Sequence, residues 1–154
     1  LNKLENFFGY RPQGWLGPGL RESMATPDIL KKEKVEYVCD WVIDDLPRWM
    51  STKYGPLICM PYTLEINDSP MYAIQYQNSH DYFQRVKDTL ATFEKEIDKN
   101  PRILTIATHP HLIGVPHRIG SFEKIIDELL DRSDTIFMTG RTISNWFKKY
   151  VKEG

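Results

Sequence analysis

The sequence predicts an α/β fold built on a parallel sheet. Short apolar runs typical of buried strands alternate with segments whose apolar residues follow helical spacing. The length of 154 residues suits one domain or part of one, and 41% hydrophobic with 27% charged residues is an ordinary globular composition. A (β/α) barrel usually takes about 250 residues, and four predicted strands do not close one. We therefore expect the C-terminal part of such a barrel.

The first half of the chain contains two predicted helices and two predicted strands. Residues 1–8 are the end of a helix that stops at Gly9. The run Thr26-Pro27-Asp28 opens a second helix, which ends near Lys34, because a hydroxyl cap, a proline and an acid all suit a helix N-terminus. The predicted strands are 35–39 and 57–60, and the predicted loops are 11–19, 40–54 and 63–78.

The second half continues the alternation. Three helices are predicted: one capped by Ser79 that runs to about residue 97, one capped by Ser121, and one over 142–151. The apolar residues expected to face inward from the last helix are Ile143, Trp146, Phe147 and Tyr150. Strands are predicted over 102–108 and 135–138, with a loop over 109–120.

Charge and cysteine usage exclude several classes of protein. Lys plus Arg is 20 and Asp plus Glu is 21, so the formal charge is −1, whereas nucleic-acid binders usually show a basic excess. No apolar run approaches the roughly 18 residues of a membrane helix, and no signal peptide is recognisable. Cys39 and Cys59 lie in apolar stretches and are expected to be buried free thiols, which suits a cytoplasmic location.

In parallel α/β folds the active site lies at the C-terminal ends of the strands. His109 and His111 follow the predicted strand over 102–108, where a histidine can act as general acid or base. A capping role is the equally weighted alternative. In extended backbone the two rings would face opposite ways, so one of them is expected to face a substrate. A zinc pair would be more specific at i, i+4 spacing.

The other strand ends carry acids and aromatic rings. Asp40, Asp44 and Asp45 form an acidic cluster that could orient a base or bind a polar substrate, although turn chemistry is favoured for Asp45. Arg11, in a loop of prolines and glycines, suits a fixed carboxylate or an oxyanion, with a solvated arginine as the alternative. Trp15, Trp41 and Trp49 could form a stacking platform for a sugar or a flat ring, whereas Trp146 belongs to the core.

Several runs together resemble the polysaccharide deacetylase superfamily. They begin with Arg11-Pro12-Gln13-Gly14-Trp15 and continue with the run from Tyr37 to Pro47, which contains Cys39-Asp40-Trp41. The runs 61–68 and 108–118, and the ending 137–146, are similar to the branch that holds cofactor-independent allantoinases and bacterial peptidoglycan deacetylases. The resemblance extends from about Leu4 to Tyr150.

The resemblance implies a distorted (β/α) barrel and hydrolysis of a carbon–nitrogen bond that is not a peptide bond. By position, Arg11 matches an arginine that orients a catalytic aspartate, and His109 matches the general acid that protonates the leaving amine. Asp40 and Trp41 match the motif that lines the substrate groove, and Trp15 is a further substrate-binding candidate. The remaining substrate-binding candidates are Asp44, Asp45, Tyr62, Asn67 and His111.

In deacetylases of this family, the catalytic aspartate and the ligands of a divalent, zinc-like metal lie in the N-terminal half. Residues 1–154 match only the C-terminal portion of the single domain, so no metal ligand is assigned here and the isolated segment is expected to be inactive.

Three interpretations of function remain open. The first is a hydrolase, acting on an N-acetylated glycan such as peptidoglycan or on a cyclic ureide as allantoinases do. The second is a non-catalytic carbohydrate-binding module that uses the tryptophans, and the third is a structural subunit of a larger assembly. The expected partners are a small-molecule or glycan substrate, without nucleic acid or membrane, and further copies of the chain in a homo-oligomer.

Overall fold

The computed structural model describes residues 1–153, which divide into two compact units. The first, called here the sheet unit, comprises Leu1–Tyr62 together with the C-terminal segment from Met138. The second, called the helical unit, comprises Thr63–Phe137. The expected α/β class is confirmed, since the chain combines a largely parallel sheet with helices.

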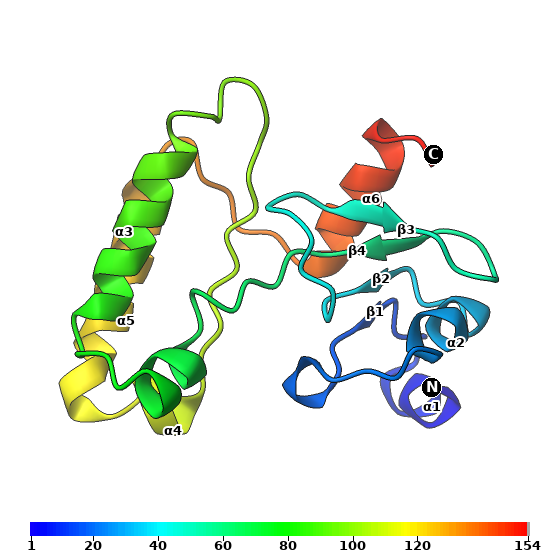
Figure 1. Cartoon of the computed structure of the whole chain (residues 1–154), viewed down its shortest axis with the longest axis horizontal. Coiled ribbons are helices and arrows are strands. Elements are labelled where there is room, and N and C mark those ends of the chain that lie inside the picture. Colours follow the sequence, from blue (N-terminus) through cyan, green and yellow to red (C-terminus); the bar gives the residue numbers. More distant parts are fainter. Residues whose placement is uncertain (154) are drawn as a thin grey trace. The chain divides into compact units, whose positions relative to one another are not determined.

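The sheet has the strand order β1-β2-β4-β3 (Figure 1). Strands β1 (Gly14–Trp15), β2 (Tyr37–Val38) and β4 (Leu57–Cys59) are parallel, and Trp15, Val38 and Cys59 stand in register. Strand β3 (Arg48–Met50) pairs with β4 in the antiparallel direction. The chain therefore leaves β1, β2 and β4 at the same edge, at Leu16, Cys39 and Met60.

The sheet unit also contains three α-helices and a short 3₁₀ helix: α1 (Asn2–Phe8), η1 (Pro18–Leu20), α2 (Thr26–Lys32) and α6 (Gly140–Tyr150). Helix α1 ends at Gly9, whose φ of 74° is easily adopted by glycine. The core of the unit is apolar and continuous with the strands; its buried members are Leu30, Val35, Val38, Leu57 and Cys59.

The Tyr37 ring packs against two glycines, Gly14 in β1 and Gly140 at the start of α6. A Cβ atom on Gly14 would stand 2.0 Å from Tyr37 Cζ, and one on Gly140 would stand 2.7 Å from the Tyr37 hydroxyl. Both values lie far inside van der Waals contact, so the ring occupies the space that a side chain at either glycine would need. Gly140 is the first residue of α6, and the start of this helix is therefore packed against β2.

The helical unit contains a π-helix, η2 (Ser69–Ile74), and three α-helices: α3 (Asp81–Phe93), α4 (Pro110–Ile113) and α5 (Pro116–Asp131). Helices α3 and α5 pack along each other (Figure 1). The buried residues of each helix recur every four positions, which places them on one helix face. The core of the unit consists of Ile66, Met71, Tyr72, Tyr82, Val86, Leu90, Ile113, Ile125 and Leu129.

Two predicted strands are wrong. Residues 102–108 and 135–138 form no strand in the described chain, and the first range contributes only a single parallel bridge between Ala107 and Asn67. Apolar sequence indicates burial, but a strand also requires a neighbouring backbone in register. Conversely, β1 and β3 lie within segments predicted as loops, because two or three residues are too short for a recognisable alternation.

Helix boundaries also differ from the expectation. Helix α5 begins at Pro116, where proline suits the first turn, and Ser121 is buried inside the helix and donates to the Ser79 carbonyl at 2.6 Å. Helix α3 is preceded by His80 and not by Ser79. Helix α6 begins at Gly140, where the Thr139 hydroxyl accepts from the Thr142 amide.

The inward face of α6 is narrower than predicted. Ser144 and Phe147 are buried there, whereas Trp146 is 37% exposed and Tyr150 is 62% exposed. Four aromatic or β-branched residues at helical spacing indicate a possible core face, and Trp49 of β3 contacts Phe147 in the middle of this set. The expectation that Trp146 and Tyr150 face inward is therefore wrong.

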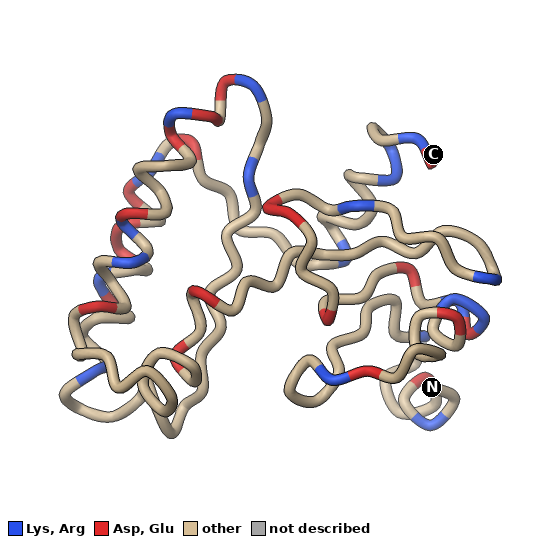
Figure 2. The backbone as a smooth tube through the Cα atoms, in the orientation of Figure 1, with Lys and Arg blue, Asp and Glu red and all other residues tan. Residues whose placement is uncertain are grey.

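The charge distribution, the helices and the two cysteines can be compared with the expectations from the sequence. Figure 2 shows Lys and Arg intermixed with Asp and Glu along the chain, without a long segment of one sign. No helix within residues 1–153 combines the length and apolar character needed to cross a membrane. Cys39 and Cys59 are free thiols as expected, Cys59 fully buried and Cys39 partly, and burial raises the pKa of each to about 11.

The contact between Gly14 and Tyr37 gives a stability prediction. Gly14→Ala should lower the free energy of unfolding by about 1–3 kcal/mol, the usual cost of overpacking, as measured by urea denaturation. Gly120→Ala is the matched control, because a Cβ atom there meets nothing within 4 Å. In a Tyr37→Leu background the cost of Gly14→Ala should shrink; an unchanged cost would mean that the ring is not its cause.

Candidate active site

His109 is the centre of the candidate site in the helical unit. It is the N-cap residue of α4 in extended backbone conformation. Its ring Nδ1 lies 2.6 Å from Asp68 Oδ1, and its backbone N–H donates to Asp68 Oδ2 at 2.7 Å. The His109 side chain is 42% exposed, whereas that of Asp68 is fully buried. One carboxylate thus fixes both the backbone and the ring, and ring atom Nε2 takes no part in this contact.

A short bridge between chain segments places Asp68 under His109. The Asp68 amide donates to the Ala107 carbonyl at 3.2 Å, and the Ala107 amide donates to the Ile66 carbonyl at 3.0 Å. The buried hydroxyl of Tyr82, on α3, donates to the same Ala107 carbonyl at 2.7 Å. The segment that leads into His109 is therefore fixed by backbone bonds on one side and by a core tyrosine on the other.

This pairing determines the chemistry that His109 can perform. A carboxylate accepts hydrogen bonds only, so the neutral ring facing Asp68 carries its proton on Nδ1. Nε2 is then the atom free to accept a proton or, in the imidazolium form, to donate one. The arrangement fits a general acid or base whose orientation is set by a buried carboxylate.

The two neighbouring candidates lie close to His109. The His111 ring centroid is 5.8 Å from that of His109, with the rings at 73°. Opposite facing was expected from extended backbone, but Pro110–Ile113 is helical, and this turns the two rings toward each other. Asn67 is buried, and its side-chain oxygen accepts from the backbone amide of Ser69 at 2.9 Å. Ser69 is the first residue of the π-helix η2.

In the sheet unit, Arg11 joins two helices. Nη1 contacts Glu5 Oε2 at 2.7 Å on α1, and Nη2 contacts Glu33 Oε2 at 2.7 Å just after α2. Nε also donates to the Glu33 carbonyl at 3.1 Å. A guanidinium held at three nitrogens has little freedom of orientation. Its predicted action on a catalytic aspartate stays a prediction.

Asp40 and Trp41 follow β2 and bind the loop around η1. Both carboxylate oxygens of Asp40 accept from the Gly17 amide, at 2.7 and 3.0 Å. The Trp41 indole N–H donates to Glu22 Oε2 at 2.5 Å, and the ring remains 40% exposed. Two adjacent side chains thus hold one loop at the end of the strand, and an indole face stays open to solvent.

The Glu22 carboxyl titrates abnormally in this setting. Burial raises the pKa of Glu22 above its ordinary value. The hydrogen bond from Trp41 opposes the rise, and the side chain of Asp40 adds to it by hydrogen bonding and by charge repulsion. Two carboxyl groups that share a site disfavour each other's ionisation, so Glu22 keeps its proton to higher pH than an exposed glutamate.

The other sheet-unit candidates have separate environments. Asp44 accepts from the Asp45 amide at 2.7 Å and pairs with Arg48, which is turn chemistry. Trp15 packs against the core, and the Trp49 ring contacts that of Phe147 at 5.3 Å between centroids, with the two planes tilted by 42°. Tyr62 is half-buried after β4. No ring contact joins Trp15, Trp41 and Trp49 in the part of the chain that the structure describes, so the expected three-ring platform is not seen.

Sequence reasoning missed two residues that contact the candidates: Asp68, which contacts His109, and Glu22, which contacts Trp41. Asp68 lies 41 residues before its partner His109, and Glu22 lies 19 residues before Trp41. No motif spacing links residues that meet only through the fold. The available signal for Asp68 was its place directly after Asn67, in a run already selected for its resemblance.

No group of three or more His, Cys, Asp or Glu side chains within residues 1–153 is arranged to bind a metal ion.

Comparison with known proteins gives relatives named as polysaccharide deacetylases and an allantoinase. No protein-family model matches the chain. A Schizosaccharomyces pombe protein, provisionally named a polysaccharide deacetylase, is 28% identical over 120 residues, which are 70% of this chain and 37% of that protein. The sequence therefore spans well under half of this curated relative.

Solved structures match over almost the whole chain. A Pseudomonas aeruginosa structure, provisionally named a polysaccharide deacetylase, is 28% identical with a TM-score of 0.87, over 99% of this chain and 52% of that one. The Puue allantoinase is 26% identical with a TM-score of 0.88, over 98% of this chain and 51% of that one. A Mycobacterium smegmatis structure at 19% identity and a TM-score of 0.77 shows the shared fold alone.

These matches confirm the resemblance proposed from the sequence. The chain is related to the polysaccharide deacetylase superfamily, with an allantoinase among its structural neighbours, and it has the α/β fold of that superfamily. It spans about half the length of the solved structures that it matches.

The His109–Asp68 contact predicts a ring tautomer. In the wild-type chain the neutral His109 ring should carry its proton on Nδ1, and Asp68→Asn should shift the ring toward the Nε2-protonated form, because the amide N–H₂ then faces Nδ1. Nitrogen-15 NMR of labelled histidine distinguishes the two forms. His117, exposed on α5, serves as the internal control. The same tautomer in both proteins would contradict the contact.

The Glu22 environment predicts a pH-dependent stability difference. The folded state binds the Glu22 proton more tightly than the unfolded state, so stability falls as pH rises through the folded pKa. Glu22→Gln cannot ionise and should gain stability relative to wild type as pH rises from near 4.5 toward neutrality. Urea denaturation at both ends of this range measures the gain. An equal gain in Glu123→Gln, on the exposed face of α5, would refute the assignment.

Proposed function

We propose that this chain forms part of a hydrolase that cleaves carbon–nitrogen bonds other than peptide bonds, with His109 as the general acid. The observation that carries the proposal is the His109–Asp68 contact, which fixes the ring through Nδ1 and leaves Nε2 for proton transfer. Relatives with a polysaccharide deacetylase name and an allantoinase structure support the reaction class.

Hydrolysis of an amide requires an activated water, stabilisation of the oxyanion and a proton for the leaving nitrogen. His109 supplies the proton: its imidazolium, oriented by Asp68, donates from Nε2 as the carbon–nitrogen bond breaks. Departing amines are poor leaving groups unless protonated, which makes this step the one where a fixed histidine contributes most.

Arg11 is proposed to orient an aspartate base that lies outside these residues. In this structure its guanidinium nitrogens contact Glu5 and Glu33, so a further carboxylate has to share Arg11 with these two glutamates or replace one of them. Deacetylases of this kind use a divalent metal to activate the water. Residues 1–153 offer no set of three ligands for one, so no step is assigned to a metal here.

The preferred substrate is an N-acetylated glycan, with peptidoglycan as the expected polymer. Trp41 supports this choice, because an exposed indole held in place by Glu22 can stack on a sugar ring. A cyclic ureide is the second candidate, favoured by the likeness to the Puue allantoinase at a TM-score of 0.88. Substrate assays separate the two: release of acetate from an N-acetylated glycan, or consumption of allantoin.

His109→Ala should lower kcat by about 10²–10⁴ in the protein that carries this chain, the usual worth of general acid catalysis. His117→Ala, which replaces another exposed histidine, is the matched control and should leave kcat unchanged. A loss below tenfold in His109→Ala would remove His109 from this role. The isolated 154-residue chain should show no turnover above its own His109→Ala variant.

A further inference from the structure

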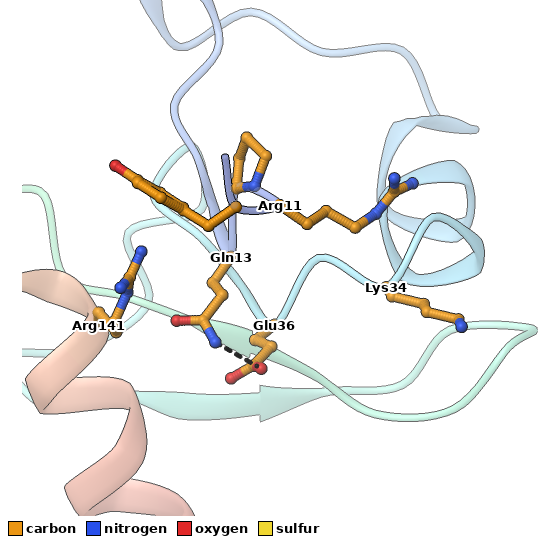
Figure 3. Close-up of a pocket in the computed structure, with 7 residues that line it drawn as sticks. Arg11, Gln13, Lys34, Glu36 and Arg141 are labelled. Carbon is orange, nitrogen blue, oxygen red and sulfur yellow. Dashed lines mark hydrogen bonds between the residues drawn. The ribbon is translucent and has the colours of Figure 1, made fainter. Parts of the chain in front are cut away.

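A cavity of about 340 Å³ opens in the sheet unit, separate from the residues assigned a role in proton transfer. Its walls are residues 10–13, together with Lys34, Glu36 and Arg141 (Figure 3). The three cations and one carboxylate in this lining give it a positive balance. The volume suits a ligand of a few heavy atoms with its water.

Two of the three cations are free of carboxylates. Arg11 is neutralised by Glu5 and Glu33, and Glu36 pairs with Lys148. Lys34 and Arg141 have no acidic partner among the described residues, so their charges are left to solvent or to a ligand. The cavity therefore favours an anion.

Arg141 is held in place by an aromatic ring. Its guanidinium lies 4.9 Å from the centroid of Tyr10, whose other ring neighbour is Phe8 at 5.9 Å. A guanidinium that lies over a ring still has an N–H edge that can donate hydrogen bonds. That edge matches the paired oxygens of a carboxylate or phosphate group.

Gln13 has a side-chain oxygen without a hydrogen-bond donor, and a simple anion cannot supply one. Its Nε2 donates to Glu36 Oε1 at 3.2 Å, which sets the orientation of the amide, since the opposite orientation would bring two acceptors together. Its Oε1 is buried and has no hydrogen-bond donor. Figure 3 shows this oxygen on the side of the cavity where Arg141 lies. A buried acceptor without a donor is costly, so a ligand that supplies an N–H or O–H is favoured.

We propose that this cavity binds a small organic acid that carries a hydroxyl or N–H group beside its carboxylate. Arg141 binds the carboxylate through its N–H edge, Gln13 Oε1 accepts from the neighbouring donor, and Lys34 adds electrostatic attraction. The cavity shares Arg11 with the proposed hydrolase function, but none of the three residues proposed to bind the acid has a role in that function.

Titration calorimetry of the 154-residue chain with glycolate and acetate tests the proposal. The two acids share a carboxylate, and only glycolate adds a hydroxyl donor. Glycolate should bind about fivefold more tightly, the usual worth of one hydrogen bond. Gln13→Met should abolish this preference, and Arg141→Gln should weaken both acids by at least about tenfold. Arg21→Gln, which removes an exposed arginine outside the cavity, should change neither.

Circular dichroism establishes that each variant is folded. If Arg141→Gln does not fold, Arg141→Lys replaces it as the test. The lysine keeps the charge but loses the two-pronged contact with the carboxylate, so its affinity for both acids should lie between that of wild type and that of a variant without the charge. Absence of saturable binding of both acids to the wild-type chain would overturn the proposal, as would equal affinities of glycolate and acetate. Because binding is the readout, either result leaves the hydrolase proposal standing.

Discussion

Burial of the Asp68 carboxylate is the constraint on which the helical unit depends. A buried carboxylate must be fully hydrogen-bonded, and both donors come from His109, one from its backbone and one from its ring. The bridge between Asn67 and Ala107 and the hydroxyl of Tyr82 hold the two segments at the required separation. The packing of the core and the orientation of the candidate acid are therefore one arrangement.

In the sheet unit, side-chain hydrogen bonds likewise fix a loop beside a candidate site residue. Asp40 and Trp41 hold the loop around η1 at the end of β2, through Gly17 and Glu22. This contact brings two carboxyl groups together, and the pKa of Glu22 rises in consequence. The two carboxyl groups lie at the edge of the sheet where α/β folds usually place their active sites. An exposed indole with a fixed orientation is the result.

The strand-end rule located His109 even though the strand assumed to precede it does not form. Residues 102–108 are partly buried, and Ala107 makes one parallel bridge with Asn67, which brings His109 next to Asp68. The mutual orientation of His109 and His111 could not be predicted, because a four-residue helix beginning at Pro110 replaces the extended backbone. Asp68 escaped prediction since nothing in its neighbourhood points to a partner 41 residues away.

The sequence by itself determined the α/β class, the parallel strands at Tyr37–Val38 and Leu57–Cys59, and the resemblance to polysaccharide deacetylases. It also singled out His109 and Asp40 as candidate residues, whose roles stay predictions. These follow from local composition, periodicity and motifs, which a linear chain records directly. The tertiary structure decided which carboxylate faces His109, which glutamate holds Trp41, and that Gln13, Lys34 and Arg141 share a cavity. Such contacts depend on how distant segments pack, and no spacing along the chain encodes them.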